Sequence, residues 1–240
     1  MNVIAVTQKG INKTENEDRI IVGKSVIANG TLYADVDDGV LAVADGVGGQ
    51  NAGAVASHFV ANRLSVVNEI SVEKLSEINN ELLKFSESNE NLKGMATTLS
   101  GVFFFGGKTQ LFSIGNTRVY LLQSRKYLKQ VTTDDTTLNY LLAMGQLKPE
   151  DADNFERKNE ITACLGGGTS DLFRMKVSYI ESINTPIMIT SDGIHDYLSI
   201  DQMEETIEEF GLTESSCLEL IKAARKNGSV DDASIILGVV

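Results

Sequence analysis

The stretch "VADGVGGQ" (residues 43–50) places one aspartate at the end of an apolar run and follows it with three glycines in four residues. The apolar run before it predicts a buried strand over 40–44, so Asp45 is expected at the end of that strand. Asp192 likewise follows an apolar run, "IMITS", and precedes a glycine. A single Asp-Gly pair usually marks a plain turn. Because two such pairs each follow a predicted buried strand, we favour a functional site built from carboxylates over two plain turns.

Two further acidic pairs stand at the starts of predicted strands. Glu17 and Asp18 precede "RIIVG", and Asp231 and Asp232 precede "ASIILGVV". In an antiparallel sheet the end of one strand lies beside the start of its neighbour, so these acids are expected to meet at one rim. Crowded carboxylates repel each other, and sets of oxygen ligands suit hard cations such as Mg²⁺ and Mn²⁺. Asp45 is suited to bridge two such ions.

Length and composition indicate one soluble domain over residues 1–240. Hydrophobic residues make up 42% of the 240, and no apolar run reaches the roughly 18–20 residues that span a bilayer. The net charge of -12 argues against nucleic acid as a partner. The N-terminus has no secretory pattern, and Cys164 and Cys217 lack metal-ligand spacing, so we expect reduced thiols and a cytoplasmic location.

The hydrophobic pattern predicts an α+β fold with two mostly antiparallel sheets packed as a sandwich and helix pairs outside. The strands from 98 to 132 are joined by short turns, which is typical of a meander. Strands are predicted at 2–7, 19–23, 40–44, 98–106, 108–115, 117–123, 126–132, 173–180, 185–190 and 234–240. Helices are predicted at 52–69, 72–88, 136–144, 200–209 and 213–226.

Six motifs in order resemble those of the PPM/PP2C metal-dependent protein serine/threonine phosphatases, most closely the bacterial single-domain branch. Each motif alone is weak, but the ordered set covers nearly the whole chain. The motifs are "NED" (16–18), "VADGVGG" (43–49), "TTLSGVFF" (97–104), "IGNTRVYLL" (114–122), "TSDGIHD" (190–196) and "VDDAS" (230–234).

The resemblance implies a four-layer αββα fold with two Mn²⁺ or Mg²⁺ ions at one rim. Asp45 would bridge both ions, and the Gly46 carbonyl would bind one of them. Asp192 and Asp231 would hold the other ion. The remaining implied roles are water orientation by Glu17 and Asp18, of which one could touch a metal, and phosphate binding by Lys13. The implied substrate is a protein phosphorylated on serine or threonine, and the implied opposing enzyme is a serine/threonine kinase.

Several positions depart from the family pattern. Lys13 stands where the family has an arginine, and lysine cannot form a bidentate fork with phosphate. Asn116 replaces an aspartate that helps bind a third metal in bacterial members, which makes a third site doubtful. Asp232 replaces an asparagine; its added negative charge either tightens metal binding or belongs to a surface acid, and we favour the surface acid. Ala163 replaces an arginine, and Val47 replaces a histidine proposed as an acid in some members.

Other features leave alternatives open. The segment 134–160 falls where the family has a variable flap, and "VTTDDTT" (131–137) lacks the family's histidine. The two histidines are interpreted differently: His58 as structural, and His195 as the better candidate for a functional role.

The departures allow a catalytically weakened domain that acts as a binding or regulatory module. A nucleotide-binding protein that uses "GGG" (166–168) or "GVGG" (46–49) is a weaker alternative, because neither is a P-loop.

Overall fold

Two antiparallel β-sheets pack face to face in the computed structural model, which describes residues 1–48, 52–180 and 185–239. One sheet has six strands in the order β10 (Tyr127–Gln130), β9 (Arg118–Gln123), β13 (Ile187–Thr190), β14 (Ala233–Val239), β1 (Asn2–Gln8) and β4 (Gly30–Asp35). The other has eight: β11 (Leu165–Gly166), β6 (Ala96–Thr97), β5 (Gly39–Val47), β7 (Leu99–Phe105), β8 (Lys108–Ile114) and β12 (Lys176–Ile180), with β2 (Asp18–Val22) beside β5 and β3 (Ser25–Ile27) beside β2.

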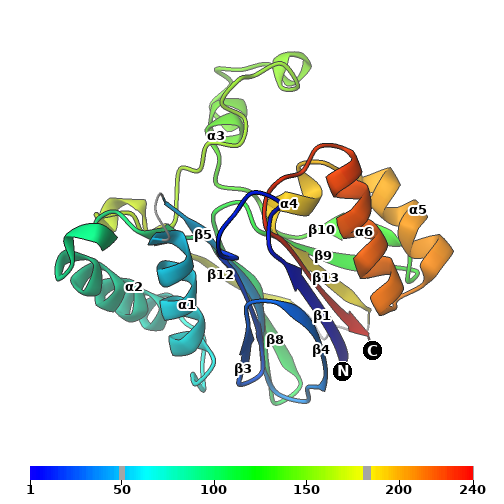
Figure 1. The fold of residues 1–240 in the computed structure, drawn as a ribbon, viewed down its shortest axis with the longest axis horizontal. Helices are drawn as coiled ribbons and strands as arrows, with labels where there is room; N and C mark the ends of the chain where they lie inside the picture. Colours follow the sequence, from blue (N-terminus) through cyan, green and yellow to red (C-terminus); the bar gives the residue numbers. More distant parts are fainter. Residues whose placement is uncertain (49–51, 181–184, 240) are drawn as a thin grey trace.

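Helices cover the outer face of each sheet (Figure 1). Helices α1 (Ala52–Leu64) and α2 (Val72–Glu87) pack on the eight-stranded sheet, where their apolar faces join Phe112 in one buried core. Helices α4 (Asp192–His195), α5 (Ile200–Phe210) and α6 (Glu214–Lys226) cover the six-stranded sheet. A third core of aliphatic side chains fills the space between the sheets. The predicted α+β sandwich is therefore confirmed.

The structure differs from the predicted elements in several places, and the short elements β3, β6, β11 and α4 were not predicted. Strand β5 continues through Asp45 to Val47, because its last residues pair with β6. Helix α1 ends at Leu64 rather than at residue 69. Strand β4 was not predicted, since it is an edge strand with few buried residues. The predicted meander is confirmed for its first and last hairpins, β7–β8 and β9–β10. It is wrong in the middle, because β8 and β9 lie in different sheets and the chain crosses between them at Gly115, which has a positive φ of 92°.

The segment 134–160 projects from the rim of the sandwich and carries α3 (Thr137–Ala143) (Figure 1). Its two ends are joined at the base by a bridge between Thr136 and Ile161. The Thr137 amide also donates to the Glu160 carbonyl at 2.8 Å. Three short 3-10 helices complete the description: η1 (Glu90–Leu92), η2 (Pro149–Asp151), which lies in the projecting segment, and η3 (Ser170–Leu172).

Candidate active site

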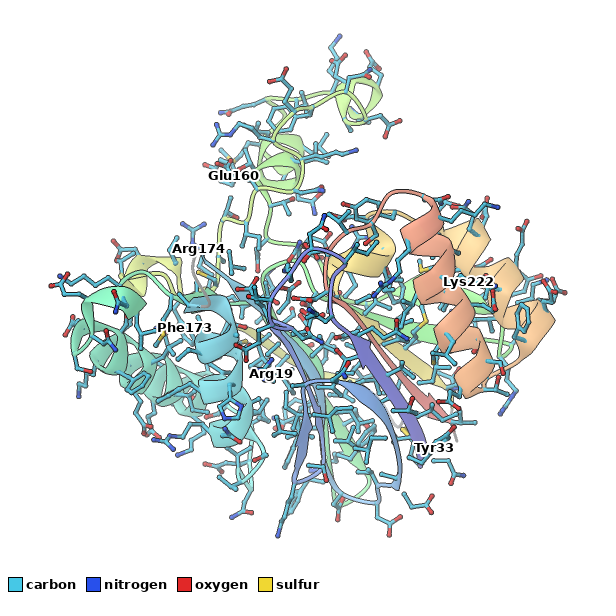
Figure 2. All side chains as sticks on the ribbon, in the orientation of Figure 1. Arg19, Tyr33, Glu160, Phe173, Arg174 and Lys222 are labelled. Carbon is cyan, nitrogen blue, oxygen red and sulfur yellow. The ribbon has the colours of Figure 1, made fainter. Side chains whose placement is uncertain are left out.

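The acidic motifs converge at one rim, where strands of both sheets begin or end. Asp18 and Asp45 face each other as paired residues of β2 and β5 in the eight-stranded sheet. Ser191, at the end of β13, and Ser234, at the start of β14, each donate a hydroxyl to Oδ2 of Asp18 at 2.7 Å. These bonds join the rims of the two sheets. Figure 2 shows side-chain oxygens gathered there, below the projecting segment that contains Glu160.

The backbone of Asp45 is fixed by the two threonines of "TTLSG". The Thr98 amide and the Thr97 hydroxyl donate to the Asp45 carbonyl at 2.8 and 2.9 Å. The Thr98 hydroxyl accepts from the Asp45 amide at 3.2 Å. The backbone amide and carbonyl of Asp45 are therefore both held by the segment where β6 meets β7. This segment, rather than a flexible turn, sets the direction of the Asp45 side chain.

Burial, and then crowding by neighbouring acids, raise the pKa values of three aspartates at the rim. Burial, and then the neighbouring charge of Asp192, raise the pKa of Asp45 well above its usual range. Burial and the charge of Asp231 raise the pKa of Asp192, which lies close enough to hydrogen-bond Asp45. Burial raises the pKa of Asp18 to about 7, with a further contribution from Asp232. The three carboxyl groups therefore resist ionisation unless positive charge lies beside them.

The donor chemistry of this rim fits a hard divalent cation. All of its acids present oxygen, and the buried side-chain oxygens that lack a hydrogen-bond partner among the described residues include two at this rim, Oδ1 of Asp18 and Oδ1 of Asn116. Within the same described ranges, no three His, Cys, Asp or Glu side chains are already arranged around one ion position. The ammonium group of Lys13 instead lies among these acids, within 3.0 Å of Glu17 and in contact with Asp231.

Asp232 is not a surface acid, and that interpretation is wrong. Its side chain is 2% exposed, and it accepts hydrogen bonds from the amides of Gly10 and Glu17 at 2.7 Å each. Its second oxygen also accepts from Nζ of Lys13 at 3.0 Å. The carboxylate of Asp232 thus anchors the loop from Gly10 to Glu17 against the start of β14.

We expect Asp232→Asn to destabilise this anchor. An asparagine side chain offers one acceptor oxygen in place of two, so at least one buried amide loses its partner, at a cost of about 2 kcal/mol. Amide hydrogen exchange should then quicken at Gly10 and Glu17, and denaturant unfolding should show the lower stability. Unchanged exchange at both amides would contradict the anchoring role.

The glycines after the two aspartates are required by close packing rather than by a turn. A Cβ atom on Gly46 would lie 2.2 Å from the Gly53 carbonyl oxygen, where the end of β5 meets the start of α1. A Cβ atom on Gly193 would lie 1.9 Å from the Asp232 carbonyl oxygen. At Gly48 an added Cβ would make only an ordinary 3.5 Å contact with the Ala52 side chain, and glycine is favoured there by a positive φ of 145°. Gly49 lies outside the described residues.

A polar cavity of about 540 Å³ adjoins the rim and is lined on one side by the projecting segment. Asn116 stands at its edge and donates to Oδ2 of Asp192 at 3.1 Å. Its floor includes an ion pair between Arg118 and Asp134. This pair was not predicted, although Arg118 lies within the "IGNTRVYLL" motif. His195 also lines this cavity; burial, and then the charge of Arg118, lower its pKa well below the usual range.

Ala163, His58, the two cysteines and the "GGG" stretch lie away from the rim acids or serve the fold. Ala163 is part of the core under α1 and α2, and His58 is exposed on α1, where it hydrogen-bonds Asn62 at 2.9 Å. Burial raises the pKa of Cys164 to about 11 and that of Cys217 to about 12, so both remain thiols. In the "GGG" stretch, two amides donate within the protein, Gly166 to Asn79 and Gly167 to Met95, so neither is free for a phosphate.

Comparison with known proteins agrees with this geometry. The protein phosphatase 2C family model matches residues 23–220 of the chain. The chain belongs to the protein phosphatase 2C family. The prediction of a protein phosphatase is therefore confirmed at the level of the family, whose members are metal-dependent. The roles of individual residues stay predictions.

Bacterial phosphatases are among the relatives and structural neighbours of this phosphatase. The serine/threonine phosphatase Stp of Listeria monocytogenes is 29% identical over 246 residues, which covers 96% of this chain and 92% of that protein. The Mycobacterium tuberculosis phosphatase PstP/Ppp superposes with a TM-score of 0.82 at 26% identity and covers 100% of this chain and 99% of its own. The PstP catalytic domain with two manganese ions gives 0.74 at 27% identity, over 99% and 98% of the two chains.

Among the described residues, no helix has both the length and the apolar character needed to cross a membrane.

Proposed function

We propose that this chain hydrolyses phosphoserine and phosphothreonine in proteins with the help of two Mn²⁺ or Mg²⁺ ions. The observation that carries the proposal is the meeting of acids from four separate motifs at one rim, with raised pKa values at Asp18, Asp45 and Asp192. Such a set is stable in its ionised form only beside cations. The manganese complex of PstP and the names of the relatives support the same conclusion.

In this proposal Asp45 and the Gly46 carbonyl hold one ion, and Asp45 with Asp192 and Asp231 holds the second. Paired divalent ions lower the pKa of a water molecule and neutralise charge on a phosphoryl group. The chain supplies the rest of the site. Asp18 is fixed by its two serine partners and, with Glu17, accepts hydrogen bonds from waters at the rim. Lys13 adds a positive charge that attracts the substrate phosphate.

The structure also supports two finer proposals about this site. The amide nitrogen of Asn116 faces Asp192, so this side chain offers a neutral group where a third cation would need charge, and we propose two ions rather than three. The segment 134–160 lines the cavity beside Asn116, and we propose that it shapes access for the phosphoprotein as a flap. The enzyme would act in the cytoplasm. It would oppose a serine/threonine kinase, because a kinase must add each phosphate that the phosphatase removes.

The proposal predicts activity that depends on divalent metal. Phosphate release from a phosphothreonine peptide and from a generic phosphate ester should fall to about 1% or less in excess chelator, because the ions supply several kcal/mol of stabilisation in the transition state. Added Mn²⁺ or Mg²⁺ should restore it. Activity that survives chelation would contradict the proposal. Binding of two Mn²⁺ ions without turnover of any phosphorylated substrate would favour a binding or regulatory module instead.

A further inference from the structure

The ammonium group of Lys13 lies between two acidic segments rather than in open solvent. Its Nζ atom is 3.0 Å from Oε2 of Glu17 and in contact with Oδ1 of Asp231. The same atom is 3.0 Å from Oδ2 of Asp232. One lysine therefore shares its positive charge among three carboxylates, and one of these is Asp231.

The backbone around Lys13 keeps the side chain in this place. The Asp232 carboxylate accepts from the amides of Gly10 and Glu17, one on each side of Lys13 in the sequence. The Ile11 amide donates to the Val230 carbonyl at 3.1 Å. The Lys13 side chain is only 28% exposed. The fixed backbone keeps the Lys13 Cα within reach of Asp231, and the three ion pairs hold the ammonium group there.

We propose that Lys13 is a built-in counter-ion that competes with a divalent cation for the carboxylate of Asp231. This inference rests on the proposed function, since it assumes that Asp231 binds such a cation. Two positive charges at one carboxylate repel each other, and partial burial weakens the screening by water. Lys13 therefore lowers the affinity of the site for metal, and it stabilises the acidic rim when no metal is bound. Lys13 influences metal binding only through Asp231, so for the metal it is a positioning residue.

Calorimetric titration of Mn²⁺ into the metal-free full chain tests the competition directly. Lys13→Met should bind its weaker Mn²⁺ roughly tenfold more tightly than the unmodified chain, within the usual range of coupling between two sites. Lys13→Arg retains the charge and should stay within about twofold. Lys24→Met is the matched control, because it removes the same charge from the exposed turn between β2 and β3, at the opposite end of β2 from Asp18.

Thermal unfolding gives a second readout that needs no turnover. In chelator, Lys13→Met leaves three acids without their shared cation, and its Tm should fall by about 2–4 °C or more. Saturating Mn²⁺ should shrink or reverse that difference, because the metal replaces the lost charge and binds the variant more tightly. A purely structural role would lower the Tm equally with and without metal, which would overturn the inference.

The outcomes separate this inference from the proposed function. If the unmodified chain binds Mn²⁺ and Lys13→Met binds it no more tightly, the competition is wrong and the phosphatase proposal is unaffected. An equal gain in Lys24→Met would also overturn it, since the effect would then come from net charge alone. If neither the unmodified chain nor any variant binds Mn²⁺, both proposals fail.

Discussion

Asp45→Asn should reduce kcat/KM for a phosphothreonine peptide at least about 1000-fold in saturating Mn²⁺, or roughly 4 kcal/mol in transition-state stabilisation. Asp45 is proposed to bridge both ions, and a neutral amide cannot balance their charge. The same variant should be at least as stable as the unmodified chain in chelator. Steady-state kinetics and thermal unfolding in EDTA measure the two effects.

The stability effect follows from the direction of the pKa shift. Burial and the charge of Asp192 raise the pKa of Asp45 in the folded chain, so this group binds a proton more readily there than when unfolded. Above its ordinary pKa, its ionised form therefore destabilises the fold, and an asparagine removes that cost. Asp37→Asn, in the exposed turn before β5, is the control. A variant that lost activity and also unfolded several degrees lower would indicate a structural role for Asp45.

Gly193→Ala should be strongly destabilising although it adds only one methyl group. The added Cβ would lie 1.9 Å from the Asp232 carbonyl oxygen and 2.9 Å from its carbon, and neither backbone atom can move without displacing β14. We expect a loss of about 3 kcal/mol in the free energy of unfolding, which lowers the Tm by about 6–12 °C. Thermal unfolding in chelator measures this without interference from bound metal.

The control for this prediction is Gly23→Ala. Gly23 has a positive φ of 57° but nothing within 4 Å of the added Cβ, so only the backbone strain of about 1 kcal/mol remains. A difference of a few degrees between the two variants supports the packing argument. Equal losses would show that the contact between Gly193 and Asp232 relaxes easily.

Local sequence pattern was sufficient for the fold class and for the positions of the acids. The apolar runs before Asp45 and Asp192 and after Asp18 and Asp231 are strands in the structure, because a buried strand requires a continuous or alternating apolar pattern. Antiparallel pairing then brings strand ends together within each sheet, β2 beside β5 in one and β13 beside β14 in the other. The sequence therefore predicts which acids stand at strand ends, whereas the packing of the two sheets brings all four to one rim.

Tertiary structure alone decided what surrounds each acid. Asp232 looks like a surface residue in its own segment, yet it is buried because Gly10, 222 residues away, donates to it. The contact of Lys13 with Asp231, the continuation of β5 through Asp45 and the crossing between sheets at Gly115 likewise depend on partners distant in the chain. Hydrophobic periodicity records which face of a strand is buried, but it carries no information about which distant group will occupy the space beside a polar side chain.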